Sequence, residues 1–427
     1  MIKTKQLTTI FESHAGQAKK AGRNDRESTF IGLNALKKEV TESLGIQRDN
    51  FGRPSIKANS AHPSEYDLVE VAETIGNILG FEKFGHSLFD KSHNLEFHGS
   101  ALEAGPGIDP TAFQGINLWT SLTAGLVEAQ IIEKYQNPAY IGDMLIQIKP
   151  TKLNGQKFIG VTGIGNKAQS RLPGEPHPRA GFGKHYVSTP ELDEQALAVE
   201  VTQEADFYDL TGQVMETAAG VGEELGYKRE LTILDLVLGV TNPYSYNGTG
   251  YNTYQTATPW INSQTNLMAD HTDIQISQAM FRKMTDPATL KEILVMPKTI
   301  LHHSDREQDF NRVLNSTEVR ETTNTNTVTI SPNPTKTKFT CLSSPILDNR
   351  MTAATGLNLS LSNAQARWYH GDFPGAFMWM EAWPLRTNAV SANEYVMRDR
   401  GLIAAFFANY RGIGAVREPR KTGVNTH

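Results

Sequence analysis

The sequence predicts an α+β fold with one long arm that has no core of its own, and three observations support this. Residues 144–190 hold seven basic residues and one acid, a net charge of +6, and are rich in Gly and Pro. Residues 191–226 hold ten acids and no Lys or Arg, a net charge of −10. The acidic block has helical apolar periodicity, whereas residues 320–345 are Thr-rich and strand-like. A basic arm beside an acidic helix indicates contact between copies of the chain, and therefore self-assembly.

The charged residues expected at this contact form two sets. The basic set lies on the arm and comprises Lys149, Lys152, Lys157, Lys167, Arg171, Arg179 and Lys184. The acidic set follows it and comprises Glu200, Glu204, Asp206, Asp209, Glu216, Glu223 and Glu224. Two alternatives stay open: both surfaces are simply solvated, or the arm folds back on its own helix.

Length and composition set outer limits on the function. A chain of 427 residues can bury a large core and corresponds to about two to three domains. The net charge of −5 argues against a chain that binds polyanions over its whole surface. The single cysteine, Cys341, excludes an internal disulfide framework and favours synthesis in a reducing cytoplasm. No secretory signal is visible, and the apolar run 402–408 is far shorter than the roughly 20 residues of a membrane span.

The N-terminal third reads as helices separated by irregular chain. Residues 1–28 are polar and predict an exposed arm or a frayed helix, and 30–44 predict an amphipathic helix. Residues 45–63 read as loop. A capping-box pattern then opens a helix over 64–80. Asp and Pro at the start of 109–135 predict a further helix that continues to the end of that range.

The arm itself reads as a long hairpin. Short strand-like runs at 157–161 and 182–187 flank the Pro-rich stretch 171–179, which cannot be helical. Loops of this length inside compact domains are usually functional or disordered. The alternation at 196–201 predicts a strand, and one apolar stripe over 207–225 predicts a helix.

Glycines have two expected roles in this predicted helix. Gly212, Gly220 and Gly222 each cost about 1 kcal/mol relative to Ala in a helix interior, so we expect them to allow a neighbouring backbone to approach closely. Gly226 lies where a helix-ending glycine is expected. The sequence therefore predicts a second helix over 229–238, closed by Gly239.

The C-terminal half alternates between helices and strand-like runs. A Tyr- and Asn-rich loop over 241–263 precedes a helix at about 273–284 and the apolar run 293–296. Another helix covers about 304–314. Two pairs of strands complete the chain; they lie at 367–373 and 376–383, and at 402–408 and 413–416.

This order of elements resembles the major capsid protein of tailed bacteriophages, whose fold is named after phage Hong Kong 97. The similarity covers roughly 110–421. Its most specific stretch is 198–212 (AVEVTQEADFYDLTG), with further matches at 223–226, 234–239, 368–373 and 398–401. The first 108 residues depart from the family's minimal pattern and would be an elaborated N-terminal arm, an insertion or a scaffolding-like segment.

The resemblance implies an organisation in which the extended loop of one subunit lies across the peripheral domain of its neighbour. The implied parts are an N-terminal arm with extra helices (1–108), an N-arm helix (109–142), the extended loop (143–195), a peripheral domain with a long spine helix (196–240), an axial α/β domain (241–365) and return strands (366–427). This arrangement gives the two charged sets a role, because a basic loop would meet an acidic helix region on another copy.

The implied function is a major capsid protein that assembles into pentamers and hexamers of an icosahedral shell around double-stranded DNA. The resemblance implies no enzymatic activity, no cofactor and no metal. The expected partners are other copies of the chain, DNA held without sequence specificity, and candidate portal, scaffolding or decoration proteins, with no membrane. The expected location is the virion, after synthesis in the host cytoplasm. One alternative is the shell of an encapsulin-like protein nanocompartment.

An alternative of a different class is a nucleotide-dependent oxidoreductase using residues 160–168. Gly163, Gly165 and Ala168 match the dinucleotide fingerprint G-x-G-x-x-A. That fingerprint needs a helix to begin there, and the prolines of 171–179 argue against one. A glycine-rich hairpin is the simpler interpretation.

Other chemical motifs are better explained as structural residues. One possible metal cluster contains His302, His303, Asp305, His271 and Asp273, and a second contains Asp90, His93, Glu96 and His98. Neither has the helical His pair with Glu of a zinc hydrolase, and adjacent histidines on a strand point to opposite faces. Cys341 is expected to be a buried thiol and not a nucleophile. Four aromatic residues with few nearby cations are expected to pack in the core: Trp368, Tyr369, Trp379 and Trp383.

Overall fold

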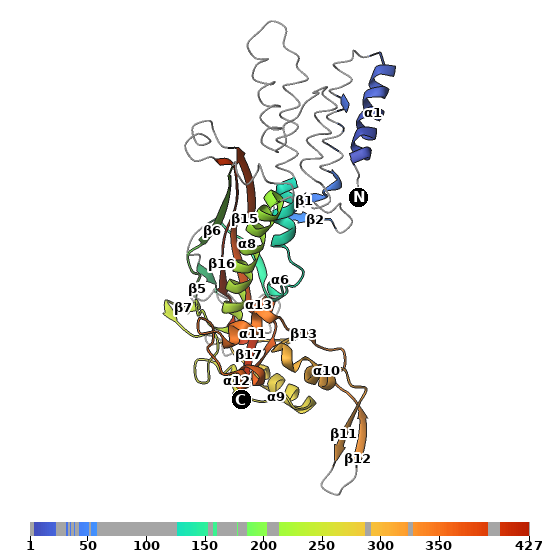
Figure 1. Ribbon diagram of the computed structural model, residues 1–427. Helices are drawn as coiled ribbons and strands as arrows, with labels where there is room; N and C mark the ends of the chain where they lie inside the picture. The colour runs from blue at the N-terminus through green and yellow to red at the C-terminus, as the bar shows by residue number, and fades with distance from the viewer. Residues whose placement is uncertain are drawn as a thin grey trace. The chain divides into compact units, whose positions relative to one another are not determined.

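A computed structural model gives the arrangement of the chain (Figure 1). It describes residues 4–22, 31–32, 35, 38, 42–50, 53–57, 126–152, 157–159, 177, 186–202, 213–286, 292–322, 328–391 and 402–426. The chain divides into two compact units. The first unit comprises Met1–Asn137, Glu194–Tyr227 and Trp383–Arg411, and the second comprises Pro138–Asp193, Lys228–Ala382 and Gly412–His427. Elements that run from one unit into the other include α8 (Gln213–Leu238), β15 (Phe377–Ser391) and β16 (Leu402–Val416).

The first unit begins with α1 (Thr4–Lys20), so the polar N-terminus forms a helix. The described positions between 31 and 43 are also helical, as predicted. Residues 126–135 form a helix that confirms the end of the one predicted over 109–135. The rest of that range and the predicted helix at 64–80 lie outside the described residues.

The prediction of a loop over 45–63 was wrong where the structure describes it, because β1 (Ile46–Arg48) and β2 (Pro54–Ile56) form an antiparallel hairpin. The Asp49 carboxylate closes its turn by accepting a hydrogen bond from the Arg53 backbone N–H at 2.9 Å. The Gln136 side chain donates to the Pro54 carbonyl at 2.7 Å. These polar contacts, rather than an apolar alternation, stabilise the hairpin.

Helix α8 is one continuous helix of 26 residues, so the predicted break at Gly226 was wrong. The apolar stripe continues past Gly226 through the buried residues Ile233 and Leu234, and this burial offsets the cost of a glycine in the helix. Gly239 has the left-handed φ of 78° that a helix-ending glycine adopts, which confirms its predicted role.

The second unit contains a five-stranded mixed sheet in the order β13-β10-β14-β17-β9. These strands are Thr340–Leu342, Thr299–His302, Trp368–Gly371, Thr422–Thr426 and Ser263–Thr265. Helices α9 (His271–Arg282) and α10 (Glu307–Asn315) contribute apolar residues to its core, including Ile274 and Phe310. Short elements absent from the prediction are α11 (Pro345–Thr352), α12 (Leu361–Ala366) and α13 (Phe373–Ala376).

A four-stranded sheet has the order β3-β15-β16-β6, with β3 at Gln147–Pro150 and β6 at Asp193–Thr202. The two strands predicted around Gly412 are one continuous strand, β16. Gly412 allows close approach here instead of a turn, because a Cβ at this position would lie 2.7 Å from Trp379 Nε1. The prediction of a break was therefore wrong.

The base of the arm is a hairpin, as predicted, and it belongs to a second four-stranded sheet. Strands β4 (Lys157–Ile159) and β5 (Tyr186–Ser188) pair antiparallel, with Phe158 opposite Val187. Strand β5 pairs in turn with β7 (Ser245–Tyr246), and β7 with β8 (Thr249–Gly250). The segment between β4 and β5 lies outside the described residues except for position 177.

The aromatic residues were predicted to pack in the core, and this is confirmed for Trp368, Tyr369 and Trp379, which are all buried. Trp383 is only half-buried, and the expectation of few nearby cations was wrong for it. The guanidinium groups of Arg386 and Arg411 lie 5.1 and 5.2 Å from its ring centroid.

Candidate assembly site at the root of the extended loop

The extended loop starts from a sheet. Helix α6 (Gly142–Leu145) leads into β3, which pairs parallel to β15 with Lys149 opposite Met380. The pairing continues one residue further, because the Thr151 N–H donates to the Glu381 carbonyl at 2.8 Å. The first residues of the loop therefore have a fixed direction set by backbone hydrogen bonds.

A buried carboxylate ties this root to α8. Glu230 is 3% exposed and accepts hydrogen bonds from the backbone N–H groups of Ile141 at 2.9 Å and Gly142 at 3.0 Å. A Cβ at position 142 would lie 2.4 Å from Glu230 Oε2, so a larger residue there would displace this carboxylate. Burial raises the pKa of Glu230, and the hydrogen bonds from Ile141 and Gly142 partly oppose that rise.

A second contact lies one residue away on the same helix. The Arg229 guanidinium forms an ion pair with the exposed Asp143 carboxylate and lies 5.5 Å from the centroid of the Trp379 ring. Arg229 thus joins α6, α8 and β15 within the second unit. Together with Glu230 it makes the loop root a rigid part of that unit.

The raised pKa of Glu230 predicts a pH-dependent stability. A raised folded-state pKa means that this group's stabilising contribution is complete below its ordinary value of 4.5 and is lost as pH rises through the raised pKa. We therefore expect the unfolding free energy of the wild type, relative to Glu230→Gln, to increase as pH falls from 7 toward 4.5. Urea unfolding of both full-length chains across this range measures the difference.

The control is Glu230→Ala, which removes both acceptors. It should destabilise the chain at every pH, by about 1–3 kcal/mol for each backbone N–H left without a partner. A wild-type advantage over Glu230→Gln that shrinks as pH falls would contradict the assignment.

The structure places only part of the predicted basic set. Lys149 and Lys152 are exposed, and the backbone of Lys157 lies in β4. The remaining members lie outside the described residues: Lys167, Arg171, Arg179 and Lys184. Partial burial lowers the pKa of Lys149, and the nearby positive charge of Arg417 lowers it further.

Arg417 is a basic residue at the loop root that the sequence reasoning missed. It directly follows β16, and its N–H donates to the Ala376 carbonyl at 2.8 Å. Because β3 and β16 both neighbour β15, the sheet brings together cations that are far apart in the sequence. No local sequence pattern indicates such a contact.

The acidic set is placed on β6 and α8. Glu200 is exposed on β6, and Glu216, Glu223 and Glu224 are exposed on α8. Three members lie outside the described residues: Glu204, Asp206 and Asp209. Three predicted carboxylates therefore lie on the exposed surface of α8. The described acids belong to the first unit and the described lysines to the second, so their contact stays a prediction.

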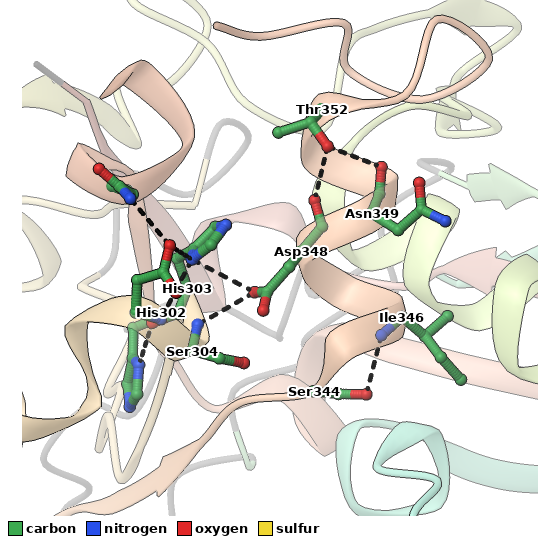
Figure 2. A network of polar contacts seen from close by, with 10 residues as sticks. His302, His303, Ser304, Ser344, Ile346, Asp348, Asn349 and Thr352 are labelled. Carbon is green, nitrogen blue, oxygen red and sulfur yellow. Dashed lines mark hydrogen bonds and ion pairs between the residues drawn. The ribbon is translucent and has the colours of Figure 1, made fainter. Parts of the chain in front are cut away.

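The histidines considered as metal ligands have separate partners (Figure 2). His302 stacks on Phe310, with ring centroids 4.4 Å apart, and burial lowers its pKa. His303 faces Asp348, whose Oδ1 lies 3.8 Å from His303 Nδ1 and accepts the Ser304 N–H at 3.1 Å. These contacts link the end of β10 to α11, which is a structural role.

The remaining motif residues have structural partners wherever they are described. Asp273 accepts the backbone N–H of Asp270 at 2.9 Å in the N-terminal cap of α9. Cys341 is half-buried, and burial raises the pKa of its thiol to about 11. Among the described residues, no group of three His, Cys, Asp or Glu could hold a metal ion. The second cluster lies outside them: Asp90, His93, Glu96 and His98.

In the described part of the chain, no helix combines the length and the apolar character that a membrane span needs.

Solved structures similar to this chain have low sequence identity to it. The capsid of a native GTA particle is 9% identical, with a TM-score of 0.39, and the match covers 67% of this chain and 89% of that chain. A structure from Mycobacterium phage Ogopogo is 14% identical, with a TM-score of 0.39 and coverages of 67% and 91%. A virus-like particle from Pyrococcus furiosus is 9% identical, with a TM-score of 0.34 and coverages of 70% and 97%. No curated protein matches the sequence.

The sequence model of one family, described as phage capsid protein, matches residues 186–421. This range covers more than half of the chain, from the strand that closes the extended loop to the segment before the last strand. It confirms the resemblance and the capsid role that the sequence predicted. The chain belongs to the phage capsid protein family.

Proposed function

We propose that this chain is the main building block of an icosahedral phage head, in which copies form pentamers and hexamers around double-stranded DNA. The observation that supports this most strongly is the family match over residues 186–421. The subunit would act by assembly alone, without catalysis and without a cofactor. Its place would be the virion, after synthesis in the host cytoplasm.

In the proposed assembly the extended loop of one subunit lies on the acidic face of α8 of its neighbour. The rigid root at Glu230 supports this role, because it sets the direction in which the loop leaves the second unit. Each exposed ion pair contributes only about 0–1 kcal/mol. Repeated around every ring of a shell, such pairs can still fix register and partner choice.

Contact with DNA in this proposal is weak and independent of base sequence. The acidic exposed face of α8 would not attract phosphates, and an acidic or neutral inner surface would let DNA slide during filling. We therefore expect isolated subunits to lack the strong, salt-sensitive affinity that proteins gain by neutralising phosphates. Portal, scaffolding or decoration proteins would be further partners.

Electron microscopy of the purified full-length chain tests the proposal. We expect closed shells of uniform diameter, and nuclease-protected double-stranded DNA in particles taken from infected cells. Shells that contain a protein cargo would instead indicate a nanocompartment. A discrete monomer or dimer with cofactor absorbance would contradict the proposal and favour an oxidoreductase.

A further inference from the structure

A two-stranded hairpin in the second unit has no supporting strand among the described residues. Strands β11 (Glu318–Thr322) and β12 (Val328–Pro332) pair antiparallel, and they form a sheet of their own. Figure 1 shows them extending beyond α10. An isolated two-stranded hairpin is marginally stable in water, and its open edges favour pairing or packing with another chain.

The base of this hairpin is nonetheless fixed. The buried Asn333 side chain donates to the Val313 carbonyl at 2.8 Å and to Ser316 Oγ at 3.0 Å. Its backbone N–H donates to the Thr317 carbonyl at 3.2 Å. Val313 belongs to the apolar core beneath α10. The hairpin is therefore projected from a rigid base in a defined direction.

One face of the hairpin carries an exposed apolar residue. Ile330 is 55% exposed, and the alternation of strand β12 puts it on the same face as Pro332. Glu318 lies opposite Pro332 in the register and is also exposed. Single exposed apolar residues are common on proteins, so Ile330 alone indicates nothing. It gains significance from a matching cavity elsewhere in the same unit.

That cavity is an apolar groove of about 500 Å³ beside α9. Its lining includes Pro259, Trp260, Ile261, Ile276, Met280 and Met284. Two of these, Ile261 and Ile276, are 54% and 49% exposed. The chain thus presents an open apolar groove with large side chains left in contact with solvent.

The groove has a rigid aromatic residue in its wall. Trp260 is 5% exposed and is packed against Tyr244 and Tyr251, with ring centroids 5.5 and 5.4 Å away. The guanidinium of the buried Arg420 lies 4.8 Å from its ring centroid. A wall held in this way is formed before anything binds, which reduces the ordering cost of binding.

Charge supports a match between hairpin and groove. The charged residue in the groove lining is Lys283, and Arg282 precedes it in the last turn of α9. The hairpin carries two acids and one Arg, a net charge of −1, and Glu318 is exposed. The hairpin thus carries an exposed apolar side chain and an exposed carboxylate, and the groove carries apolar side chains and a lysine.

We propose that the groove of one copy receives the β11–β12 hairpin of a neighbouring copy, with Ile330 in the apolar groove and Glu318 near Lys283. This inference rests on the proposed function, because it requires that copies of the chain assemble side by side. Hairpin and groove are different surfaces, so the contact is head-to-tail, and such contacts close into rings when the rotation permits. The contact would therefore help to define the ring of a capsomer.

Engineered cysteines test this contact directly. The chain has one native cysteine, so Cys341→Ala gives a cysteine-free background. In that background Ile330→Cys is combined with Ile276→Cys, and assembled particles are oxidised and run on a non-reducing denaturing gel. We expect a ladder of linked chains that ends at the ring size, while each single-cysteine variant remains monomeric. A disulfide requires Cα atoms within about 7 Å, so Ile261→Cys and a short bis-maleimide provide a second position and a longer reach.

A second measurement needs no cysteine. We expect Ile330→Ser to reduce the assembled fraction at least tenfold at the concentration where half of the wild type assembles. Lys336→Ser, an exposed position in the turn after β12, is the matched control and should assemble normally. Gel filtration and circular dichroism establish that both variants fold.

Three outcomes would overturn the inference. In the first, shells form with no cross-link at either groove position, and this leaves the proposed function intact. In the second, Ile330→Cys alone gives linked dimers, which shows that hairpins pair with each other. In the third, Ile330→Ser assembles as well as Lys336→Ser. Failure of the wild type itself to assemble would instead contradict the proposed function, and the inference with it.

Discussion

Reversing three lysines of the extended loop, Lys152→Glu, Lys157→Glu and Lys167→Glu, is expected to abolish shell assembly and leave folded subunits. The change takes the net charge of residues 144–190 from +6 to zero. It removes the attraction to the block 191–226, whose net charge is −10. Analytical sedimentation and electron microscopy measure the assembled fraction, and circular dichroism measures folding.

The control carries the same change in total charge at exposed lysines outside the loop: Lys20→Glu, Lys134→Glu and Lys336→Glu. It should assemble like the wild type at equal ionic strength. Since the Debye length is about 10 Å at 0.1 M salt, added salt should weaken wild-type assembly, and it should have little further effect on the loop variant. Normal shells from the loop variant would show that the charge argument is wrong.

A mixing experiment separates contact between copies from a loop that folds back on its own helix. A second variant carries Glu216→Lys, Glu223→Lys and Glu224→Lys on α8. Alone, it presents a basic helix to a basic loop and should fail to assemble. In the mixture, the unchanged basic loop of the helix variant can meet the unchanged acidic helix of the loop variant, so assembly should be partly restored only if the loop acts on another copy. Two variants that stay unassembled when mixed would favour the intramolecular alternative.

Local patterns predicted those parts of the fold whose cause is local. The β4–β5 hairpin follows from strand-like runs on either side of a Pro-rich stretch, and the end of α8 follows from Gly239. The two charged sets are also local, because each is a continuous block of sequence. These features could be predicted without knowing which residues pack against them.

Glycines show why other parts could not be predicted. Gly226 and Gly412 both resemble the end of an element, yet both lie inside one. Gly412 is set by Trp379, 33 positions earlier in the chain, whose indole leaves no space for a Cβ. The Glu230 contact with Ile141 likewise spans 89 positions. Tertiary contacts determine the roles of these glycines and of Glu230. The sequence pattern therefore predicted the loop itself but not the contacts that hold its root.

Substitutions at two glycines of α8, Gly220 and Gly222, are expected to change the free energy of unfolding in opposite directions. A Cβ on Gly222 would lie 2.2 Å from the carbonyl oxygen of Ile131, in the helix 126–135. Gly220 has no such neighbour within 4 Å among the described residues. The expected close approach of a backbone is therefore confirmed at Gly222 and wrong at Gly220, while Gly212 lies outside the described residues.

We therefore expect Gly222→Val to lower the free energy of unfolding by about 3 kcal/mol or more, because overpacking must displace a backbone and not a flexible side chain. Gly220→Ala should raise it by about 0.5–1 kcal/mol, since Ala loses less conformational entropy than Gly in a helix. Urea unfolding of the full-length chain at neutral pH measures both. A Gly222→Val variant as stable as the wild type would show that α8 does not pack against helix 126–135 in this way. Glu223 and Glu224 follow Gly222 directly, so the packing that excludes a side chain at 222 also sets the direction of the acidic face proposed to receive the loop.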